Sequence, residues 1–274
     1  RFTNRGMVSI PWTTPISSLP KDISESLECY QIKERFGNLA STIWETVWGY
    51  LILNHNERKS YWDMVKKKLE ARRMDWLFGR TTAKDAVRVW LKKHHGIPNS
   101  EYLGYPADIE IGEDDYGRPV PKGKWVQEIG IIPALSMAHA DRMAVAVVGP
   151  PNQRLGIDLE QIRAREEGFK TLAFTEGESA LLNSLEASSR EEWMTRFWCA
   201  KEAVGKALGR GLIEGPKSLV VQELDAQTGT VKVALQGKLS EMFPEYAGTQ
   251  IIVYTAKEEN YIVASTICEI IRET

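Results

Sequence analysis

The sequence has few cysteines and no long apolar run. Its three cysteines, Cys29, Cys199 and Cys268, are widely spaced and form no C-x-x-C pair. This spacing argues against a zinc ribbon or a disulfide framework and predicts three reduced thiols. The longest apolar stretches are strand-sized, whereas a membrane helix needs roughly 18–20 apolar residues. Residues 1–20 also lack the continuous apolar segment of a secretory signal. We therefore expect a cytoplasmic protein with no membrane partner.

No charge of one sign dominates. Lys and Arg total 35 and Asp and Glu total 37, which leaves a formal net charge of -2. A general attraction to nucleic acid is therefore not expected, although a local basic patch is compatible with this total. The chain has no G-x-x-x-x-G-K-[ST] loop and no G-x-G-x-x-G turn, which argues against nucleotide-binding enzymes of those types. With 43% hydrophobic and 26% charged residues, the composition is that of a globular protein.

The pattern of elements divides the chain into three parts. Residues 1–55 are predicted to be a lead-in, a linker or an N-terminal extension, because early prolines discourage regular structure. Residues 56–150 and 151–274 each show helices followed by a run of strands. This order favours an α+β fold, and its recurrence predicts a pseudodimer of two similar halves. The repetition is expected at the level of elements and not of residues.

Individual elements follow from periodicity and from turn residues. Helices are predicted at 56–77, 81–94, 177–185 and 190–208. Strands are predicted at 107–111, 134–138, 143–148, 155–159, 218–223, 230–235, 250–255 and 261–267. Gly79 stands between the first two helices and is expected to separate them.

A predicted helix in the second half carries the most informative side chains. In the segment Trp198-Cys199-Ala200-Lys201-Glu202-Ala203-Val204-Gly205-Lys206, Glu202 and Lys206 are four residues apart. Residues at this spacing share one face of a helix. The pair is either part of a functional site or an ordinary surface ion pair, and this segment alone does not decide.

A predicted strand before that helix carries two carboxylates. Asp158 and Glu160 in the segment Gly156-Ile157-Asp158-Leu159-Glu160 point to one side, because side chains alternate along a strand. Neighbouring carboxylates repel each other, and a hard divalent cation such as Mg²⁺ relieves the repulsion. The alternative is a strand with a solvated acidic face.

Three weaker motifs lie in the first half. His139 closes a predicted strand, and Arg118 follows a turn glycine. Arg80 and Lys84 share a face at a predicted helix start, where backbone N–H groups favour an anion. Taken alone, each motif also fits a structural role, namely a packed histidine, a common turn and a solvated helix end.

The order and spacing of these segments resemble the larger, pseudodimeric 4′-phosphopantetheinyl transferases of the surfactin-synthetase type. That family carries a G-[IV]-D-x-E strand followed by W-[SCT]-x-K-E-x-x-x-K on a helix, and both motifs match here. Upstream, the family has a G-R/K-P turn, a strand that ends near a histidine and a basic G-R-x-x-A-[KR] helix start. The three weaker motifs occupy these places. The resemblance implies an active site at the interface of the two halves.

The resemblance implies a holo-[acyl-carrier-protein] synthase activity. Such an enzyme moves the 4′-phosphopantetheine arm of coenzyme A to a serine of an apo acyl or peptidyl carrier protein and releases adenosine 3′,5′-bisphosphate. Mg²⁺, with Mn²⁺ as an alternative, would be held by Asp158, Glu160 and Glu202. Coenzyme A, the co-substrate, would be bound through the following cationic residues: Arg80, Lys84, Arg118, His139 and Lys206.

The family pattern also implies catalytic side chains. The segment Phe174-Thr175-Glu176-Gly177-Glu178 matches F-[ST]-x-x-E, which puts Glu178 at the position of the proposed general base. Lys201 and Lys206 would assist the transfer. Glu178 also completes a T-x-x-E capping box with Thr175, so it could begin a helix instead of, or in addition to, acting as a base.

Two other functions are compatible with parts of this pattern. One is a catalytically inactive module that binds carrier proteins, and the other is a different Mg²⁺-dependent nucleotide enzyme. The carrier is either a separate protein or a carrier domain of the same chain, since this family also occurs at the C-terminus of polyketide and polyunsaturated fatty-acid synthases. We expect a monomer.

One segment after the acidic strand is a candidate docking surface for the carrier. Arg163, Arg165 and Lys170 surround Phe169, which is expected to be exposed. Such a loop could steer an acidic carrier helix by charge and anchor it by one aromatic ring. A solvated loop is the alternative.

Overall fold

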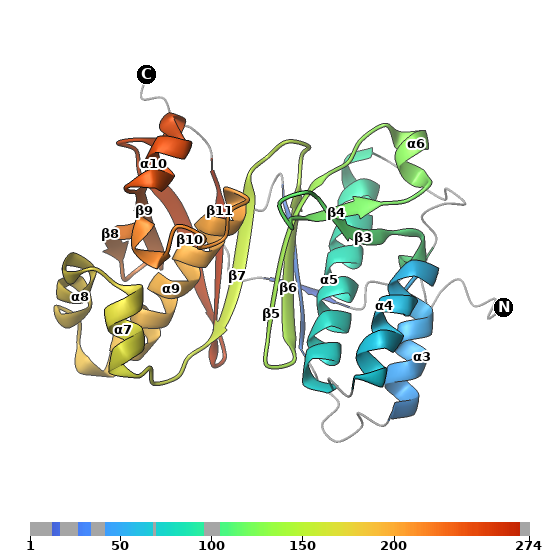
Figure 1. The fold of residues 1–274 in the computed structure, drawn as a ribbon, viewed down its shortest axis with the longest axis horizontal. Helices are drawn as coiled ribbons and strands as arrows, with labels where there is room; N and C mark the ends of the chain where they lie inside the picture. Colours follow the sequence, from blue (N-terminus) through green and yellow to red (C-terminus); the bar gives the residue numbers. More distant parts are fainter. Residues whose placement is uncertain (1–12, 17–26, 34–41, 68–69, 96–104, 269–274) are drawn as a thin grey trace. The chain divides into compact units, whose positions relative to one another are not determined.

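The computed structural model describes the chain outside residues 1–12, 17–26, 34–41, 68–69, 96–104 and 269–274 (Figure 1). The chain forms two compact units that divide between Asn152 and Gln153. Each unit has a long helix packed on an antiparallel sheet, which confirms the predicted α+β class. Within the described residues, no helix is long and apolar enough to cross a membrane.

The first unit is built on a sheet with the strand order β1-β2-β6-β5. These strands are β1 (Thr14–Pro15), β2 (Glu28–Lys33), β5 (Ala134–Ala140) and β6 (Met143–Gly149). A separate hairpin consists of β3 (Glu110–Glu113) and β4 (Pro119–Lys122). The helices are α3 (Thr42–Ile52), α4 (His55–Lys66), α5 (Glu70–His95) and α6 (Trp125–Ile129), with a 3₁₀ turn η1 (Pro106–Asp108). β6 is buried along its length because it pairs with a strand on either side.

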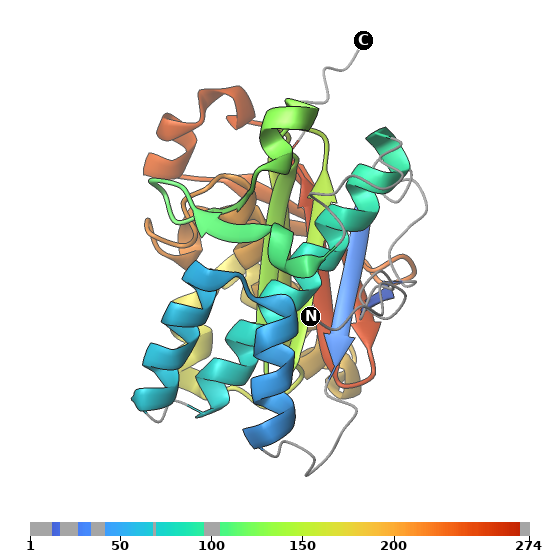
Figure 2. The same cartoon turned by 90° about the vertical axis from the view of Figure 1, so that its right-hand side faces the viewer.

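Helix α5 packs on this sheet against β2, β5 and β6, and α3 and α4 lie beside it (Figure 2). The apolar stripe Ala83, Ala86, Val87 and Leu91 recurs at helical spacing and is fully buried. Gly79 lies inside this helix, where an added Cβ would stand 2.6 Å from Met137 Cε. The glycine therefore permits a close approach of α5 to β5 and does not end a helix.

The second unit contains a five-stranded antiparallel sheet with the order β7-β11-β10-β9-β8. The strands are β7 (Leu155–Gln161), β8 (Leu219–Asp225), β9 (Thr230–Leu235), β10 (Ile251–Glu258) and β11 (Tyr261–Ile267). The helices are α7 (Glu167–Ala173), α8 (Glu176–Asn183), α9 (Arg190–Ala207) and α10 (Lys238–Met242). Three 3₁₀ turns are η2 (Ala187–Ser189), η3 (Pro216–Ser218) and η4 (Pro244–Tyr246). The predicted strands in this unit are therefore found: β9 and β11 have the predicted bounds, and the bounds of β7, β8 and β10 differ by one to three residues.

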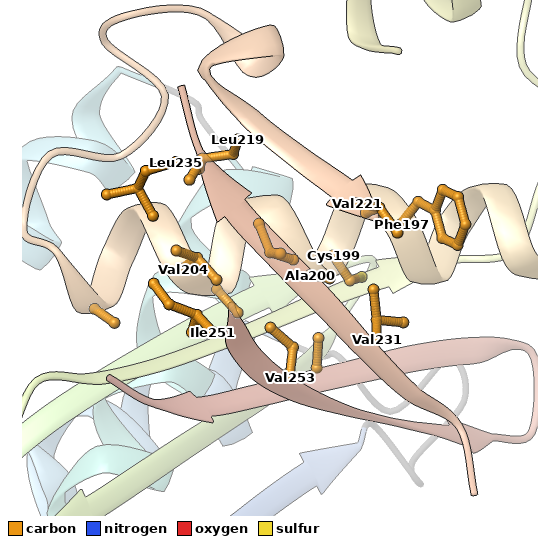
Figure 3. Packing of buried hydrophobic residues seen from close by; sticks show 14 of the residues in the cluster. Phe197, Cys199, Ala200, Val204, Leu219, Val221, Val231, Leu235, Ile251 and Val253 are labelled. Atoms are coloured by element: carbon orange, nitrogen blue, oxygen red, sulfur yellow. The ribbon is translucent and has the colours of Figure 1, made fainter. Parts of the chain in front are cut away.

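Helix α9 crosses this sheet, and the core of the unit lies between them (Figure 3). Phe197, Ala200 and Val204 of α9 are fully buried and face apolar side chains of β8, β9 and β10. Their spacing of three and four residues puts them on one side of the helix. This apolar side fixes the rotation of α9 about its axis, which decides where the polar residues between them point.

The two units share one order of elements. Each runs through a strand (β2 or β7), two short helices (α3 and α4, or α7 and α8), a long helix, a hairpin, a short helix and two paired strands. In the first unit β2 pairs with β6, the last strand, and in the second unit β7 pairs with β11, the last strand; β1 is an addition at the edge of the first sheet. This agreement confirms the predicted likeness of the two halves.

Three sequence predictions differ from the structure. Part of the predicted lead-in, residues 1–55, supplies β2 and α3, because β2 completes the first sheet against β6. Gly79 is interior to α5 for the packing reason given above, and the predicted helix 56–77 is instead divided between α4, which ends at Lys66, and α5, which begins at Glu70. The short helices α6, α7 and α10 were not predicted, since a segment of this length carries too few residues to show a helical period.

Candidate active site

The acidic strand and the long helix of the second unit touch at a glycine. A Cβ added to Gly156 in β7 would collide with the backbone carbonyl of Ala203 in α9. Only a residue without a side chain allows α9 to pack this closely on the strand. Ala203 follows Glu202 directly, and Gly156 precedes Asp158 by two residues on the same strand. The contact therefore brings the predicted carboxylates of β7 and α9 together.

Asp158 and Lys206 form an ion pair across this contact. Lys206 Nζ lies 2.7 Å from Asp158 Oδ1 and donates a second hydrogen bond to the Ile157 carbonyl at 3.2 Å. The Asp158 side chain is 9% exposed, and its second oxygen, Oδ2, is buried with no hydrogen-bond partner in the described part of the chain. A buried carboxylate oxygen without a partner is unfavourable in a protein. This oxygen is thus available to a cation or to a donor from a ligand.

Glu202 completes an acidic group at the same place. Burial raises the pKa of Glu202 to about 7, and the negative charges of Asp158 and Glu160 add to that effect, while Lys206 opposes it. The shift shows that these three carboxylates lie within electrostatic reach of one another. A proton or a divalent cation relieves this concentration of negative charge.

Glu160 is held by two donors. Arg165 Nη2 lies 2.7 Å from Glu160 Oε2, and Trp198 Nε1 donates to Glu160 Oε1 at 3.3 Å. The Trp198 contact comes from the same helix as Glu202, so both motifs recognised in the sequence meet here. Arg165 is 11% exposed, and the sequence predicts it on the docking surface for a carrier and not beside Glu160. A basic residue shortly after an acidic strand is the only sequence signal for this contact.

The three carboxylates have the chemistry that a hard divalent cation prefers. Among the described residues, no group of three His, Cys, Asp or Glu side chains has the arrangement of a metal site as it stands. The unpartnered Asp158 oxygen and the raised pKa of Glu202 nevertheless fit a hard cation, which prefers carboxylate oxygens and relieves their repulsion. The residues present therefore fit the ion that the sequence predicts.

Glu178 and Lys201 lie in the interior and face each other. Lys201 Nζ is 2.8 Å from Glu178 Oε1, and neither side chain has any exposed area. Lys201 also donates to the carbonyls of Ala173 at 2.7 Å and Pro216 at 3.1 Å. Glu178 caps α8 with Thr175, as the capping-box interpretation predicts. Both side chains are therefore fully engaged inside the protein.

The first unit brings two of its predicted residues to one area. Gly79 packs close to His139, whose Cδ2 would lie 3.5 Å from a Cβ at that glycine. The next residue, Arg80, lies with its guanidinium 3.6 Å from the centre of the Trp76 ring. Burial lowers the pKa of Arg80 to about 10, and its Nε has no hydrogen-bond partner within the described residues. His139 itself is exposed. These two groups can contact an anionic ligand.

The other two predicted cations of this unit have different surroundings. Lys84 is fully buried and donates to the carbonyl of Ile52 at 2.7 Å and to Glu57. It has no solvent-exposed surface through which a ligand could reach it. Arg118 is 48% exposed and pairs with Asp114 at 2.7 Å, next to the β3–β4 hairpin. It can exchange that exposed partner for a phosphate.

The predicted docking segment is partly wrong in its geometry. Phe169 is half-buried and packs edge-on against Trp198, with ring centres 5.0 Å apart, because α7 folds onto the core of its unit. Arg165 serves Glu160, and Lys170 pairs with Glu167 at 3.0 Å. Arg163 is exposed, which is compatible with a docking role.

Comparison with known proteins identifies the family. A family model described as the 4′-phosphopantetheinyl transferase superfamily matches residues 154–264. A holo-[acyl-carrier-protein] synthase of Shewanella amazonensis is 32% identical over 115 residues, which is 40% of this chain and 90% of that protein. The 4′-phosphopantetheinyl transferase HetI of a Nostoc species is 31% identical over 115 residues, 40% of this chain and 46% of that protein.

Among solved structures, the holo-[acyl-carrier-protein] synthase of Thermotoga maritima is 23% identical, with a TM-score of 0.33 over 41% of this chain and 61% of that chain. The family model covers most of the second unit, which is also where the acidic group lies. The chain belongs to the 4′-phosphopantetheinyl transferase superfamily.

Proposed function

We propose that the chain transfers the 4′-phosphopantetheine arm of coenzyme A to a serine hydroxyl of an apo acyl or peptidyl carrier protein. In this reaction the serine oxygen forms a bond to one phosphorus of the pyrophosphate. The bond from that phosphorus to the bridging oxygen breaks, and adenosine 3′,5′-bisphosphate leaves. The observation that carries the proposal is the acidic group of Asp158, Glu160 and Glu202, which stands beside Lys206.

Asp158, Glu160 and Glu202 would hold Mg²⁺ or Mn²⁺ in this reaction. The bound cation would neutralise charge on the pyrophosphate as the phosphorus is attacked. Lys206, which is 30% exposed, can turn its ammonium from Asp158 toward a phosphate oxygen. Arg165 and Trp198 orient Glu160 through its two oxygens, so that carboxylate keeps one direction.

The 3′-phosphate and the adenine of coenzyme A are the natural ligands for the cations of the first unit. The Arg80 guanidinium lies over Trp76 with its Nε 4.0 Å from Glu57 Oε1, and His139, which lies against Gly79, is exposed. Arg118 adds a third donor that is only loosely held on the surface. Charge-assisted hydrogen bonds of this kind suit a phosphate monoester. Lys84 is not included because its ammonium is buried and paired.

A carrier protein would approach the segment after β7. Arg163 is exposed there, and Leu172 on α7 is 68% exposed. We assign the apolar anchor to Leu172 and not to Phe169, whose ring lies against Trp198. A cation and an exposed aliphatic side chain on one segment suit an acidic helix with an apolar patch.

One incubation tests the function. The full chain is mixed with coenzyme A, Mg²⁺ and a set of apo carrier proteins, and the carriers are weighed by mass spectrometry. We expect a mass gain of one phosphopantetheine group and release of adenosine 3′,5′-bisphosphate. Glu202→Gln should lose the activity, whereas Glu191→Gln, an exposed residue of the same helix, should retain it. If no carrier gains mass while the chain retains each of them on a column, the inactive binding module is the better reading.

A further inference from the structure

The buried pair of Glu178 and Lys201 has a counterpart in the first unit. There Glu57 caps α4 with Asn54, as Glu178 caps α8 with Thr175. Lys84 of α5 donates to Glu57, as Lys201 of α9 donates to Glu178. Both glutamates occupy the third position of their helix and are buried.

The remaining contacts of the two pairs also correspond. Lys84 donates to the carbonyl of Ile52, which lies two residues before the N-cap of α4. In the same way, Lys201 donates to the carbonyl of Ala173, two residues before the N-cap of α8. The second oxygen of each glutamate accepts a hydrogen bond from the first strand after the long helix. These bonds are Ile111 N to Glu57 Oε1 at 3.0 Å and Val221 N to Glu178 Oε1 at 2.8 Å. Four kinds of contact thus recur.

The repeat extends to the residues of the long helices. Ala83-Lys84-Asp85-Ala86-Val87 in α5 corresponds to Ala200-Lys201-Glu202-Ala203-Val204 in α9. The two alanines and the valine of each segment are fully buried. The halves of the chain therefore repeat at the level of residues as well as of elements, contrary to the expectation from sequence.

The pair in the second unit is saturated by the protein. An ammonium has three N–H donors, and Lys201 uses them on Glu178, Ala173 and Pro216. A carboxylate offers about four acceptor positions, and Glu178 receives bonds from Thr175 N, Thr175 Oγ1, Val221 N and Lys201. No position remains for a serine proton or for a phosphate oxygen.

The pair ties the long helix to four other segments. Through Lys201 and Glu178, α9 is joined to the ends of α7, to α8, to η3 and to β8. Glu202 is the next residue along α9, so its direction is fixed when Lys201 is fixed. In the first unit the corresponding acid, Asp85, is fully buried and accepts from Thr13 and Arg88. The same framework therefore presents an acid in one unit and encloses it in the other.

We propose that Glu178 and Lys201 are positioning residues that hold Glu202 at the site, and that the chain carries this clamp a second time as Glu57 and Lys84. None of the four side chains contacts a substrate. The serine proton then leaves through a group other than Glu178, and coenzyme A is bound without Lys84. The inference rests on the proposed function only in treating Glu202 as a site residue.

The test uses matched variants of the full chain in both units. Lys201→Met leaves the buried Glu178 without its cation, and Lys84→Met leaves the buried Glu57 with only Arg80, whose Nε lies 4.0 Å from Glu57 Oε1. Each variant should lower the Tm by about 5–15 °C, with the smaller loss in Lys84→Met. The double variant Glu178→Gln with Lys201→Met should lower the Tm by less than the sum of the decreases in the two single variants. The reason is that the double variant has no buried, uncompensated charge. Glu176→Gln, an exposed neighbour, is the control and should leave the Tm unchanged.

Kinetics separate a clamp from a catalytic group. Glu178→Gln should keep kcat at saturating Mg²⁺ within about threefold of the parent chain, with an unchanged pH–rate profile. The Mg²⁺ concentration that gives half of the maximal rate should rise, because Glu202 is held less firmly, and an unchanged Mg²⁺ dependence would contradict the positioning role. Lys84→Met should keep the apparent KM for coenzyme A within about threefold. A kcat loss above a hundredfold in Glu178→Gln at unchanged Tm, or loss of the acidic limb of its profile, would overturn the inference, because a general base gives that result. A tenfold rise in the KM for coenzyme A in Lys84→Met at unchanged Tm would also overturn it.

The stability measurements remain decisive if a single variant fails to fold. If the double variant folds under conditions in which Lys201→Met alone is unfolded, the coupling between Glu178 and Lys201 is supported. If the decreases in Tm of the single variants simply add up in the double variant, the coupling is contradicted. Failure of the parent chain to modify any carrier would instead count against the proposed function. The coupling between Glu178 and Lys201 would still be measured, so the two failures are distinguishable.

Discussion

Glu202→Gln is expected to make the protein more stable and less active. At pH 8 and without divalent metal, the parent chain holds Glu202 ionised next to two other carboxylates. Burial and those charges raise its pKa from 4.5 to about 7, which corresponds to at most about 3 kcal/mol against the ionised form. Because the side chain is only partly buried, solvent screening reduces this to about 1–2 kcal/mol.

The direction in which stability changes with pH follows from the pH at which the folded and the unfolded chain each release the Glu202 proton. The unfolded chain loses this proton near the ordinary value and the folded chain near 7, so the folded state binds more protons in that window. This group therefore makes the free energy of unfolding fall as the pH rises from about 4.5 to about 7. Glutamine cannot ionise, so the variant lacks this loss.

Thermal unfolding in EDTA at pH 5 and pH 8 measures the effect. We expect Glu202→Gln to match the parent chain at pH 5 and to exceed its Tm by about 2–8 °C at pH 8. Added Mg²⁺ should raise the Tm of the parent chain and leave the variant nearly unchanged, since ligand binding stabilises only a competent site. Transfer activity of the variant should fall at least a hundredfold. A variant that is less stable than the parent at pH 8 would refute the electrostatic argument.

Three further outcomes are expected. Gly156→Ala should abolish transfer and lower the Tm by more than 5 °C, because the new Cβ would collide with the Ala203 carbonyl. Normal activity of this variant would contradict the close contact of β7 with α9. His139→Ala should raise the KM for coenzyme A about tenfold and the KM for 3′-dephospho-coenzyme A by less than twofold, since a charge-assisted contact is worth about 1.5–3 kcal/mol. Equal increases in the two KM values would indicate that His139 has a packing role. Arg163→Glu and Leu172→Ala should each raise the KM for the carrier and leave that for coenzyme A unchanged, and the Arg163 effect should shrink in a salt series.

The motifs of the second unit could be predicted because their geometry is local. Asp158 and Glu160 share a face through strand alternation, and Glu202 and Lys206 through helical spacing. Their meeting depends on Gly156, whose role is visible only when α9 lies on β7. Arg165 reaches Glu160 from a loop, and no periodicity predicts such a contact.

The cations were harder to assign because sequence does not show burial. Lys84 and Arg80 share a helix face and both lie near Glu57, yet Lys84 is fully enclosed, whereas Arg80 lies over Trp76 with its Nε 4.0 Å from Glu57 Oε1. The Glu57 partner comes from another helix, so the enclosure of Lys84 is a tertiary property. β2 was missed for a similar reason, since its pairing with β6 spans a long stretch of chain.

The ring of Trp76 shows what a tandem arrangement permits. Counted from the clamp lysine, Trp76 and Arg80 stand where Trp193 and Phe197 stand in the other unit. In the second unit the tryptophan faces the Phe197 ring at 6.4 Å, inside a hydrophobic core. In the first unit it faces a guanidinium instead. With two units in one polypeptide, one helix can exchange a core aromatic for a cation while the other keeps its core. A chain that assembled from identical subunits would have to make that exchange in every subunit at once.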